Sequence, residues 1–252
     1  MKGPAADVQT AAKRATSAAW SPRQRIRVWD LPLRIFHWAL VVAVSTAVTT
    51  GELGGKWMEL HSKAGLSILG LVVFRIVWGL IGSTHARFAR FAPTPRTLRA
   101  YVRGRWKGVG HNPLGALSVF ALLALLAVQA STGLFSRDDI EFTGPLSPLI
   151  DDSLASTLTG WHQQLANVLL VLTAVHVIAI AFYAVWKKNN LVKPMVTGWT
   201  DLDAGEPSEP EPRKGGLLAF FVAAGVALAS VYVVSVVLPA KPAPAATSAP
   251  AW

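Results

Sequence analysis

The chain contains no cysteine among its 252 residues. This excludes disulfides, cysteine-ligated iron–sulfur clusters, thiolate-ligated haem and haem attached covalently through a Cys-x-x-Cys-His motif. Charged residues are scarce at 15%, hydrophobic residues make up 52%, and the mean hydropathy is positive. A glycine-rich dinucleotide fingerprint and a P-loop lysine are also missing. The composition is typical of an integral membrane protein, and any redox cofactor in it would be bound non-covalently.

Five apolar segments are long enough to cross a hydrocarbon core, which takes about 20 residues. We expect transmembrane helices at 33–50, 60–82, 113–135, 161–186 and 216–238. The predicted fold is an all-α integral membrane protein, in which four helices form a bundle and a fifth C-terminal helix is added. We expect a flexible cytoplasmic arm at 1–26, the four-helix domain at 27–198, an acidic linker at 199–215 and a Pro/Ala-rich external tail at 239–252.

The charges that flank these segments are distributed unevenly. Residues 83–112 include a series of Arg and Lys but no acid, and basic clusters also precede the first span and follow the fourth. The connection from the third span to the fourth sets Arg137 alone against Asp138, Asp139, Glu141, Asp151 and Asp152. The positive-inside rule therefore predicts a cytoplasmic N-terminus and an external C-terminus. The same topology explains the net charge of +10 without nucleic acid. Tryptophans near the span ends, Trp78 among them, are interpreted as interfacial anchors.

Four of the six histidines lie inside the apolar segments. His162 and His176 share one predicted helix, where their spacing puts them on nearly the same face, about 21 Å apart along the axis. By predicted depth, His61 matches His162 on the outer side and His37 matches His176 on the inner side. Ionisable side chains within a membrane are costly and usually functional. The pattern therefore predicts two histidine pairs stacked across the bilayer.

Two histidines from two helices would give zinc or copper an incomplete set of ligands. Haem iron takes four ligands from the porphyrin and needs only two axial donors. We therefore predict two bis-histidine b haems, an outer one on His61 and His162 and an inner one on His37 and His176. Six-coordinate iron has no open position, which favours electron transfer over oxygen binding.

Basic side chains near these histidines are candidates for binding haem propionates. Arg75 is predicted at the depth of the inner haem, and Arg34 lies three residues before His37. For both arginines the alternative is a side chain that reaches the interface without a cofactor contact. Lys63 is a candidate for the outer haem or a solvated lysine.

The remaining histidines lie in the cytoplasmic connection between the second and third spans. We interpret His85 as a surface residue. His111 opens the third span and is a weak candidate for lining a quinone headgroup site near the inner haem.

These residues resemble the bacterial di-haem cytochrome b561 family, which includes the membrane b-type cytochrome subunits of nickel–iron hydrogenases. The similarity covers roughly 27–198 and rests on the stretches 28–38, 61–65, 75–78, 111–115 and 161–183. It implies a four-helix bundle with two b haems in the bacterial inner membrane, which exchanges electrons between a quinone pool and a partner protein. The linker, fifth span and tail have no counterpart in this pattern, and the added helix is a candidate for docking another subunit.

Our leading interpretation is electron transfer between quinone and a periplasmic redox protein, such as a c-type cytochrome, or a dehydrogenase subunit. The acidic connection around 138–152 suits a basic cytochrome c, although ordinary solvated loop charge explains it equally well. The first alternative is a haem-containing membrane anchor or sensor with little turnover. The second is a transporter with a histidine proton relay, against which the lack of repeats and of intramembrane acids counts. Whether the chain is a complete oxidoreductase or one subunit stays open, as do further membrane subunits or a second copy as partners.

Overall fold

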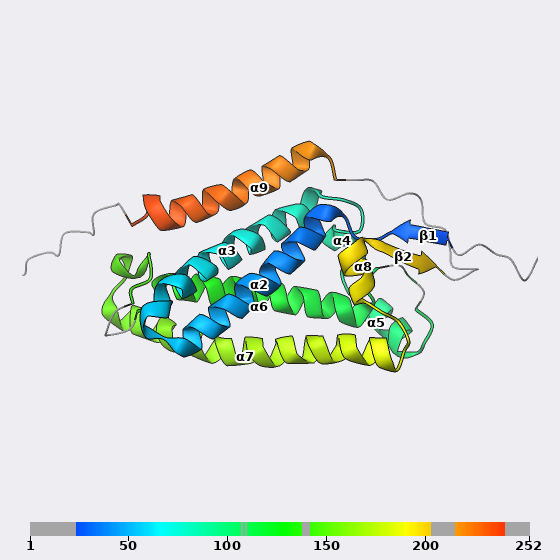
Figure 1. Cartoon of the computed structure of the whole chain (residues 1–252), viewed down its shortest axis with the longest axis horizontal. Helices are drawn as coiled ribbons and strands as arrows, with labels where there is room; N and C mark the ends of the chain where they lie inside the picture. Colours follow the sequence, from blue (N-terminus) through cyan, green and yellow to red (C-terminus); the bar gives the residue numbers. More distant parts are fainter. Residues whose placement is uncertain (1–23, 107, 109, 138–141, 203–214, 240–252) are drawn as a thin grey trace, which may run out of the picture.

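A computed structural model describes residues 24–106, 108, 110–137, 142–202 and 215–239. Its long helices are α2 (Leu31–Leu53), α3 (Met58–Ile81), α6 (Pro113–Phe135), α7 (Asp152–Val185) and α9 (Leu217–Tyr232). Each of the five, with the short turns that adjoin α3 and α9, is long and apolar enough to cross a membrane. The predicted all-α integral membrane fold is therefore confirmed (Figure 1).

Shorter elements connect the long helices. They are β1 (Gln24–Arg27), η1 (Gly55–Trp57), α4 (Phe88–Phe91), α5 (Pro95–Val102), η2 (Ser147–Leu149), α8 (Val192–Thr197), β2 (Trp199–Leu202) and the π-helical η3 (Val233–Val237). β1 and β2 form an antiparallel ribbon in which Arg27 pairs with Trp199. Sequence reasoning had assigned 24–26 to a flexible arm and 199–202 to an unstructured linker, so the ordered domain extends further at both ends. The rest of the predicted arm, linker and tail lies outside the described residues.

Side-chain caps determine where the long helices begin. Asp30 Oδ1 accepts a hydrogen bond from Leu33 N at 2.7 Å at the start of α2, and Asn112 Oδ1 accepts one from Gly115 N at 2.7 Å in α6. Asp151 caps α7 in the same way, 2.9 Å from Leu154 N. With this cap, α7 begins at Asp152 and not near 161. The hydropathy of the sequence did not indicate this start because the first turns of α7 are polar. Two acids expected in a connecting loop thus lie at a helix N-terminus, where negative charge is favourable.

The four bundle helices are arranged as two neighbouring pairs, α2 with α3 and α6 with α7 (Figure 1). α3 contacts α2, α6 and α9, whereas α7 packs mainly on α6. An apolar cluster joins the two pairs, in which Ile68 and Val72 of α3 meet Leu126 of α6 and Leu169 of α7. Leu169 lies midway between His162 and His176, so this cluster separates the two histidine pairs.

The fifth long helix, α9, packs against α3 of its own chain. Ala223 is fully buried there, and a Cβ atom on Gly70 of α3 would come within 3.0 Å of Val231. Phe220, at the other end of α9, stacks edge-on against Trp78. The two helices are therefore antiparallel, and small residues allow them to approach closely, as is usual between membrane helices. One face of the helix that was a candidate for docking another subunit is thus occupied within the chain.

Candidate functional site

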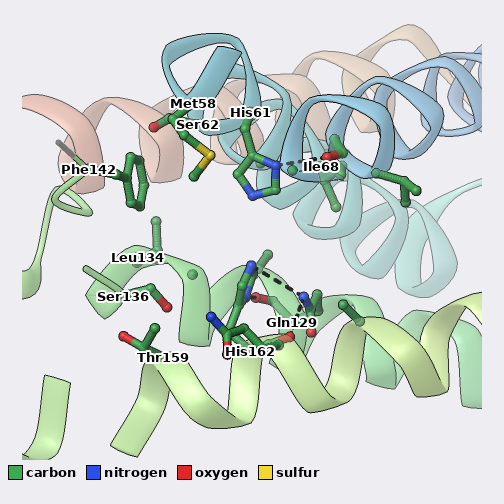
Figure 2. Close-up of a pocket in the computed structure, with 18 of the residues that line it drawn as sticks. Met58, His61, Ser62, Ile68, Gln129, Leu134, Ser136, Phe142, Thr159 and His162 are labelled. Carbon is green, nitrogen blue, oxygen red and sulfur yellow. Dashed lines mark hydrogen bonds between the residues drawn. The ribbon is translucent and has the colours of Figure 1, made fainter. Parts of the chain in front are cut away.

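His61 of α3 and His162 of α7 face each other across a cavity. The centroids of their rings lie 6.1 Å apart, and the cavity has a volume of about 540 Å³. Figure 2 shows the two imidazoles on opposite walls of this space. The volume falls in the range of roughly 300–1,000 Å³ that is usual for cofactor sites. The structure thus brings together the pair that was matched by depth, and their role as haem ligands stays a prediction.

Both of these rings are oriented by backbone carbonyl groups. His61 Nδ1 lies 2.8 Å from Ala47 O on α2, and His162 Nδ1 lies 3.0 Å from Gln129 O on α6. Such contacts place the proton on Nδ1 and leave Nε2 as the electron-pair donor, which is the usual arrangement of metal-binding histidines. The Gln129 amide nitrogen lies 3.3 Å from His162 Nε2 and donates to His162 O at 3.0 Å. Two neighbouring helices therefore hold the donor atoms in place.

Two glycines make room for the same rings. A Cβ atom on Gly51 would lie 3.1 Å from the His61 ring, and one on Gly133 would lie 2.8 Å from the His162 ring. Sequence reasoning did not identify either glycine. Their position within apolar helices could have identified them. Glycine in a helix interior lowers helix stability by about 1 kcal/mol relative to alanine, so a glycine there suggests that a larger side chain would collide with a neighbour.

The second pair, His37 of α2 and His176 of α7, lies further along the bundle. The two side chains are close enough to interact electrostatically. His37 Nδ1 is buried without a hydrogen-bond partner, and the ring packs edge-on against Trp38 at a centroid distance of 5.2 Å. These rings thus lie near each other as predicted by depth, but His37 has no carbonyl to orient it. Their assignment to an inner haem stays a prediction.

Arg75 of α3 is buried, with 2% of its surface exposed. Its guanidinium carbon lies 4.4 Å from the centroid of the Phe88 ring, which fits over Gly79 because a Cβ there would come within 2.2 Å of that ring. Arg75 Nη1 has no hydrogen-bond partner, and Asp30 interacts with the guanidinium only at longer range. A buried guanidinium with an unused donor is suited to a planar anion such as a propionate.

Asp30 connects the start of α2 to the end of α3. Besides capping α2, it accepts hydrogen bonds through Oδ2 from Trp78 Nε1 at 3.1 Å and from Ser83 Oγ. Trp78 is only 1% exposed. Its expected place in an interfacial belt is therefore wrong, because its indole N–H is used inside the protein.

Arg34 contacts the backbone of α8. It donates through Nη1 to Val196 O, while its Nε is buried without a partner. Trp38 donates to the neighbouring Met195 O at 3.3 Å. Gly198, at φ 87°, completes the turn that packs on Arg34. Arg34 thus attaches α8 to α2, and its predicted contact with the inner haem is a second role that stays a prediction.

His111 lies between aromatic rings at the same end of the bundle. Its ring centroid is 4.5 Å from that of Trp29 and 4.6 Å from that of Phe91. Burial, with smaller contributions from Arg75, His176 and His85, lowers the pKa of His111 to about 3. Its Nδ1 is buried without a partner. His85 is itself half-buried, so neither histidine is a simple surface residue.

The unpaired buried atoms gather at one end. Among the described residues these are Arg34 Nε, His37 Nδ1, Arg75 Nη1, His111 Nδ1 and Gln129 Oε1. All but the last lie at the end of the bundle with His37 and His176. No group of three or more His, Asp or Glu side chains suited to a metal ion occurs in the described part of the chain. Paired histidines beside unpaired cationic donors fit haem, which brings both a metal with two axial positions and carboxylates.

An apolar helical bundle in which histidines of different helices lie near one another is typical of membrane-bound b-type cytochromes. Residues 28–198 match the family model described as prokaryotic cytochrome b561, and the chain therefore belongs to that family. It is a multi-pass membrane protein that carries haem b and transfers electrons across the membrane.

Curated relatives match about two thirds of the chain. A probable Ni/Fe-hydrogenase B-type cytochrome subunit of Azotobacter chroococcum mcd 1 is 26% identical in an alignment 215 positions long, which covers 69% of this chain and 88% of the relative. The protein of the same description in Azotobacter vinelandii is 25% identical, with the same coverage. That of Rhizobium leguminosarum bv. viciae is 25% identical over 70% of this chain and 89% of its own. No solved structure matches the chain.

Proposed function

We propose that this cytochrome moves electrons through two bis-histidine b haems, between the membrane quinone pool and a redox partner on the periplasmic side. The observation that carries the proposal is the placement of His162 and His176 on one helix, where His162 faces His61 across a cavity and His176 interacts electrostatically with His37. Fourteen residues of α-helix separate the two ligands by about 21 Å along the axis, so the two sites would divide the span of the bilayer.

The residues that would hold each haem follow from the geometry. His61 and His162 would present Nε2 to one iron, and His37 and His176 would bind the other. Arg75, with its unused donor, and Arg34 would bind propionates of the second haem. Haem supplies a reversible one-electron carrier. The apolar cluster around Leu169 lies between the two sites and excludes water from the path.

The charge distribution supports an orientation with the N-terminus in the cytoplasm of a bacterial inner membrane and the C-terminus in the periplasm. The His61–His162 site then faces the periplasm and the His37–His176 site the cytoplasm. His111 and Asn112 lie at the cytoplasmic end, where Asn112 Nδ2 donates to Tyr183 OH at 3.0 Å. These polar groups next to His176 are a suitable surrounding for a quinone headgroup.

The partner is expected to be a dehydrogenase-type catalytic module. This rests on the relatives, which are described as cytochrome subunits of Ni/Fe-hydrogenases. A soluble periplasmic c-type cytochrome is the second candidate, supported by the acids Asp151 and Asp152 at the exposed start of α7. Three of the five acids of this connection, at 138–141, lie outside the described residues.

Quinol reduction of the purified protein tests the proposal. A short-chain quinol analogue should reduce both haems of the wild-type chain. In His162→Ala it should still reduce the remaining haem at a similar rate, whereas in His176→Ala the rate should fall at least tenfold because the first acceptor is lost. Haem that no quinol reduces would support an anchor or sensor instead, and equal rates in the two variants would place the quinone site elsewhere.

A further inference from the structure

The cavity between His61 and His162 contains one cationic side chain among the described residues that line it. This residue is Arg137, and the cavity's one acid among those residues is Glu52. Arg137 lies two residues after the end of α6 and four residues after Gly133, the glycine that packs against the His162 ring. Sequence reasoning had treated Arg137 only as a minor charge in an acidic loop. Its position makes it part of the same site as the histidines.

The backbone of Arg137 is fixed relative to His162. Arg137 N donates to Thr159 Oγ1 at 3.1 Å, and Thr159 lies on α7 one turn before His162 and also lines the cavity. A β-bridge joins Arg137 to Thr143 on the returning chain. Gly144 packs so closely on the end of α6 that a Cβ atom there would come within 2.5 Å of Leu134 O. These contacts hold the base of the Arg137 side chain at the mouth of the cavity.

The guanidinium of Arg137 is paired with an exposed acid. Its Nη1 donates to Asp152 Oδ1 at 2.5 Å, and the two side chains are 33% and 82% exposed. An ion pair with so exposed a carboxylate is weakly held because water competes for both partners. A guanidinium has five N–H donors and can bind a second carboxylate in bidentate geometry. Arg137 can therefore donate hydrogen bonds to an anion inside the cavity while its backbone stays at the cavity entrance.

Lys63, the other cation near this pair in the sequence, is placed differently. Its ammonium group lies 2.6 Å from Glu59 Oε1, and its side chain is 67% exposed. Lys63 is two residues from His61, which turns it about 200° around α3, and it is absent from the described lining of the cavity. The earlier candidate for the outer haem therefore faces away from the site.

We propose that Arg137 binds a propionate of the haem held by His61 and His162, with Asp152 as the counter-ion it partly exchanges for that propionate. The inference rests on the proposed haem at this site. A propionate at the end of α6 stays near the membrane surface, where its charge costs less than in the hydrocarbon core. The positive charge of Arg137 favours the reduced haem, which carries one positive charge fewer than the oxidised form.

The test compares Arg137→Gln with Lys63→Gln in the full-length, haem-loaded protein. The readouts are haem transfer to excess apomyoglobin and a potentiometric titration of each haem. Arg137→Gln should lose the haem of the His61–His162 site about tenfold faster. Its midpoint should fall by about 59 mV, which corresponds to a tenfold change for one electron. Lys63→Gln should match the wild type in both measurements.

Asp152→Asn provides an independent variant that keeps the arginine. It should raise the midpoint of the same haem, because Arg137 is released from its counter-ion, and the double variant with Arg137→Gln should lose that rise. Retention of the haem at His37 and His176 reports that each variant is folded. Equal behaviour of Arg137→Gln and the wild type, or an equal effect of Lys63→Gln, would overturn the inference alone. A wild-type protein without haem at His61 and His162 would instead overturn the proposed function.

Discussion

The two ends of the bundle hold their histidines in different ways. At the His61–His162 end, each ring receives a backbone carbonyl from a neighbouring helix and packs against a glycine. At the His37–His176 end, His37 Nδ1, Arg75 Nη1 and other buried atoms are unpaired. The first site is therefore shaped by the protein itself, whereas the second has groups whose partners a bound ligand would supply.

This difference has an energetic consequence. An unsatisfied buried polar group costs about 1–3 kcal/mol. Haem propionates would relieve this cost for Arg75 Nη1 and Arg34 Nε at the His37–His176 end, whereas Gln129 Oε1 at the other end is an acceptor that a propionate cannot serve. We therefore expect haem binding to stabilise the fold mainly through the second site, and binding at the first site to depend more on the precise fit of the rings.

The largest expected effect comes from removing one ligand at each end. His162→Ala should lower the haem content from two per chain to one, and His176→Ala should do the same at the other site, because each iron loses an axial ligand. A pyridine haemochrome count with low-temperature spectra distinguishes the two remaining haems. Loss of both haems from a variant that keeps its wild-type helical circular dichroism would contradict two independent haem sites.

Substitutions of Arg75 and Arg34 test which arginine binds a haem propionate at the His37–His176 end. Arg75→Gln should weaken haem binding there by about 10–100-fold, the usual effect of removing a group that supports a metal site. Arg34→Gln is the matched variant and should have a smaller effect, because Arg34 already donates to Val196 O. Haem transfer to apomyoglobin measures both. An equal or greater effect of Arg34→Gln would show that the buried guanidinium of Arg75 does not bind the propionate.

Gly133 tests the fit at the His61–His162 end. Gly133→Ala places a Cβ atom 2.8 Å from the His162 ring, so the ring must shift and haem binding there should weaken by about tenfold. Gly160→Ala on α7 is the control, since a Cβ there meets nothing within 4 Å and alanine favours the helix by up to about 1 kcal/mol. The haem count after gel filtration separates the two. An unchanged count in Gly133→Ala would mean that the glycine is not needed to seat His162.

His111 gives the smallest expected effect, in the pH dependence of stability. Its pKa is lowered to about 3 in the folded protein, whereas an unfolded histidine titrates near 6.5. Between these values only the unfolded chain binds the proton, so stability falls as pH decreases from 6.5, by up to about 1.4 kcal/mol per pH unit. Thermal unfolding at pH 7 and pH 5 should show a smaller difference in His111→Phe than in the wild type. His85→Gln is the comparison, and an identical pH dependence in His111→Phe would contradict the burial of this ring.

Features that depend on local composition and on helical spacing could be predicted from the sequence. Hydropathy located the five helices, and helical spacing placed His162 and His176 on one face of α7. The start of α7 was missed because it depends on the Asp151 cap, and Trp78 was misplaced because its hydrogen bond to Asp30 joins residues distant in the sequence.

Other features, which depend on contacts between segments without a depth signal, could not be predicted. The β1–β2 ribbon pairs Arg27 with Trp199, and neither segment has a strand pattern strong enough to indicate the other. Arg137 belongs to the His61–His162 site only because the chain folds back through Thr143 and Thr159. Hydropathy and spacing indicate which residues share a depth in the membrane, but they do not show which loop side chain closes a cavity.

We propose above that the chain holds two b haems, one at each histidine pair. A potentiometric titration of the purified full-length protein, with a pyridine haemochrome count, tests it most directly. We expect two low-spin b haems per chain that titrate as two one-electron components, of which His162→Ala removes one and His176→Ala the other. A single component with one haem per chain would contradict it.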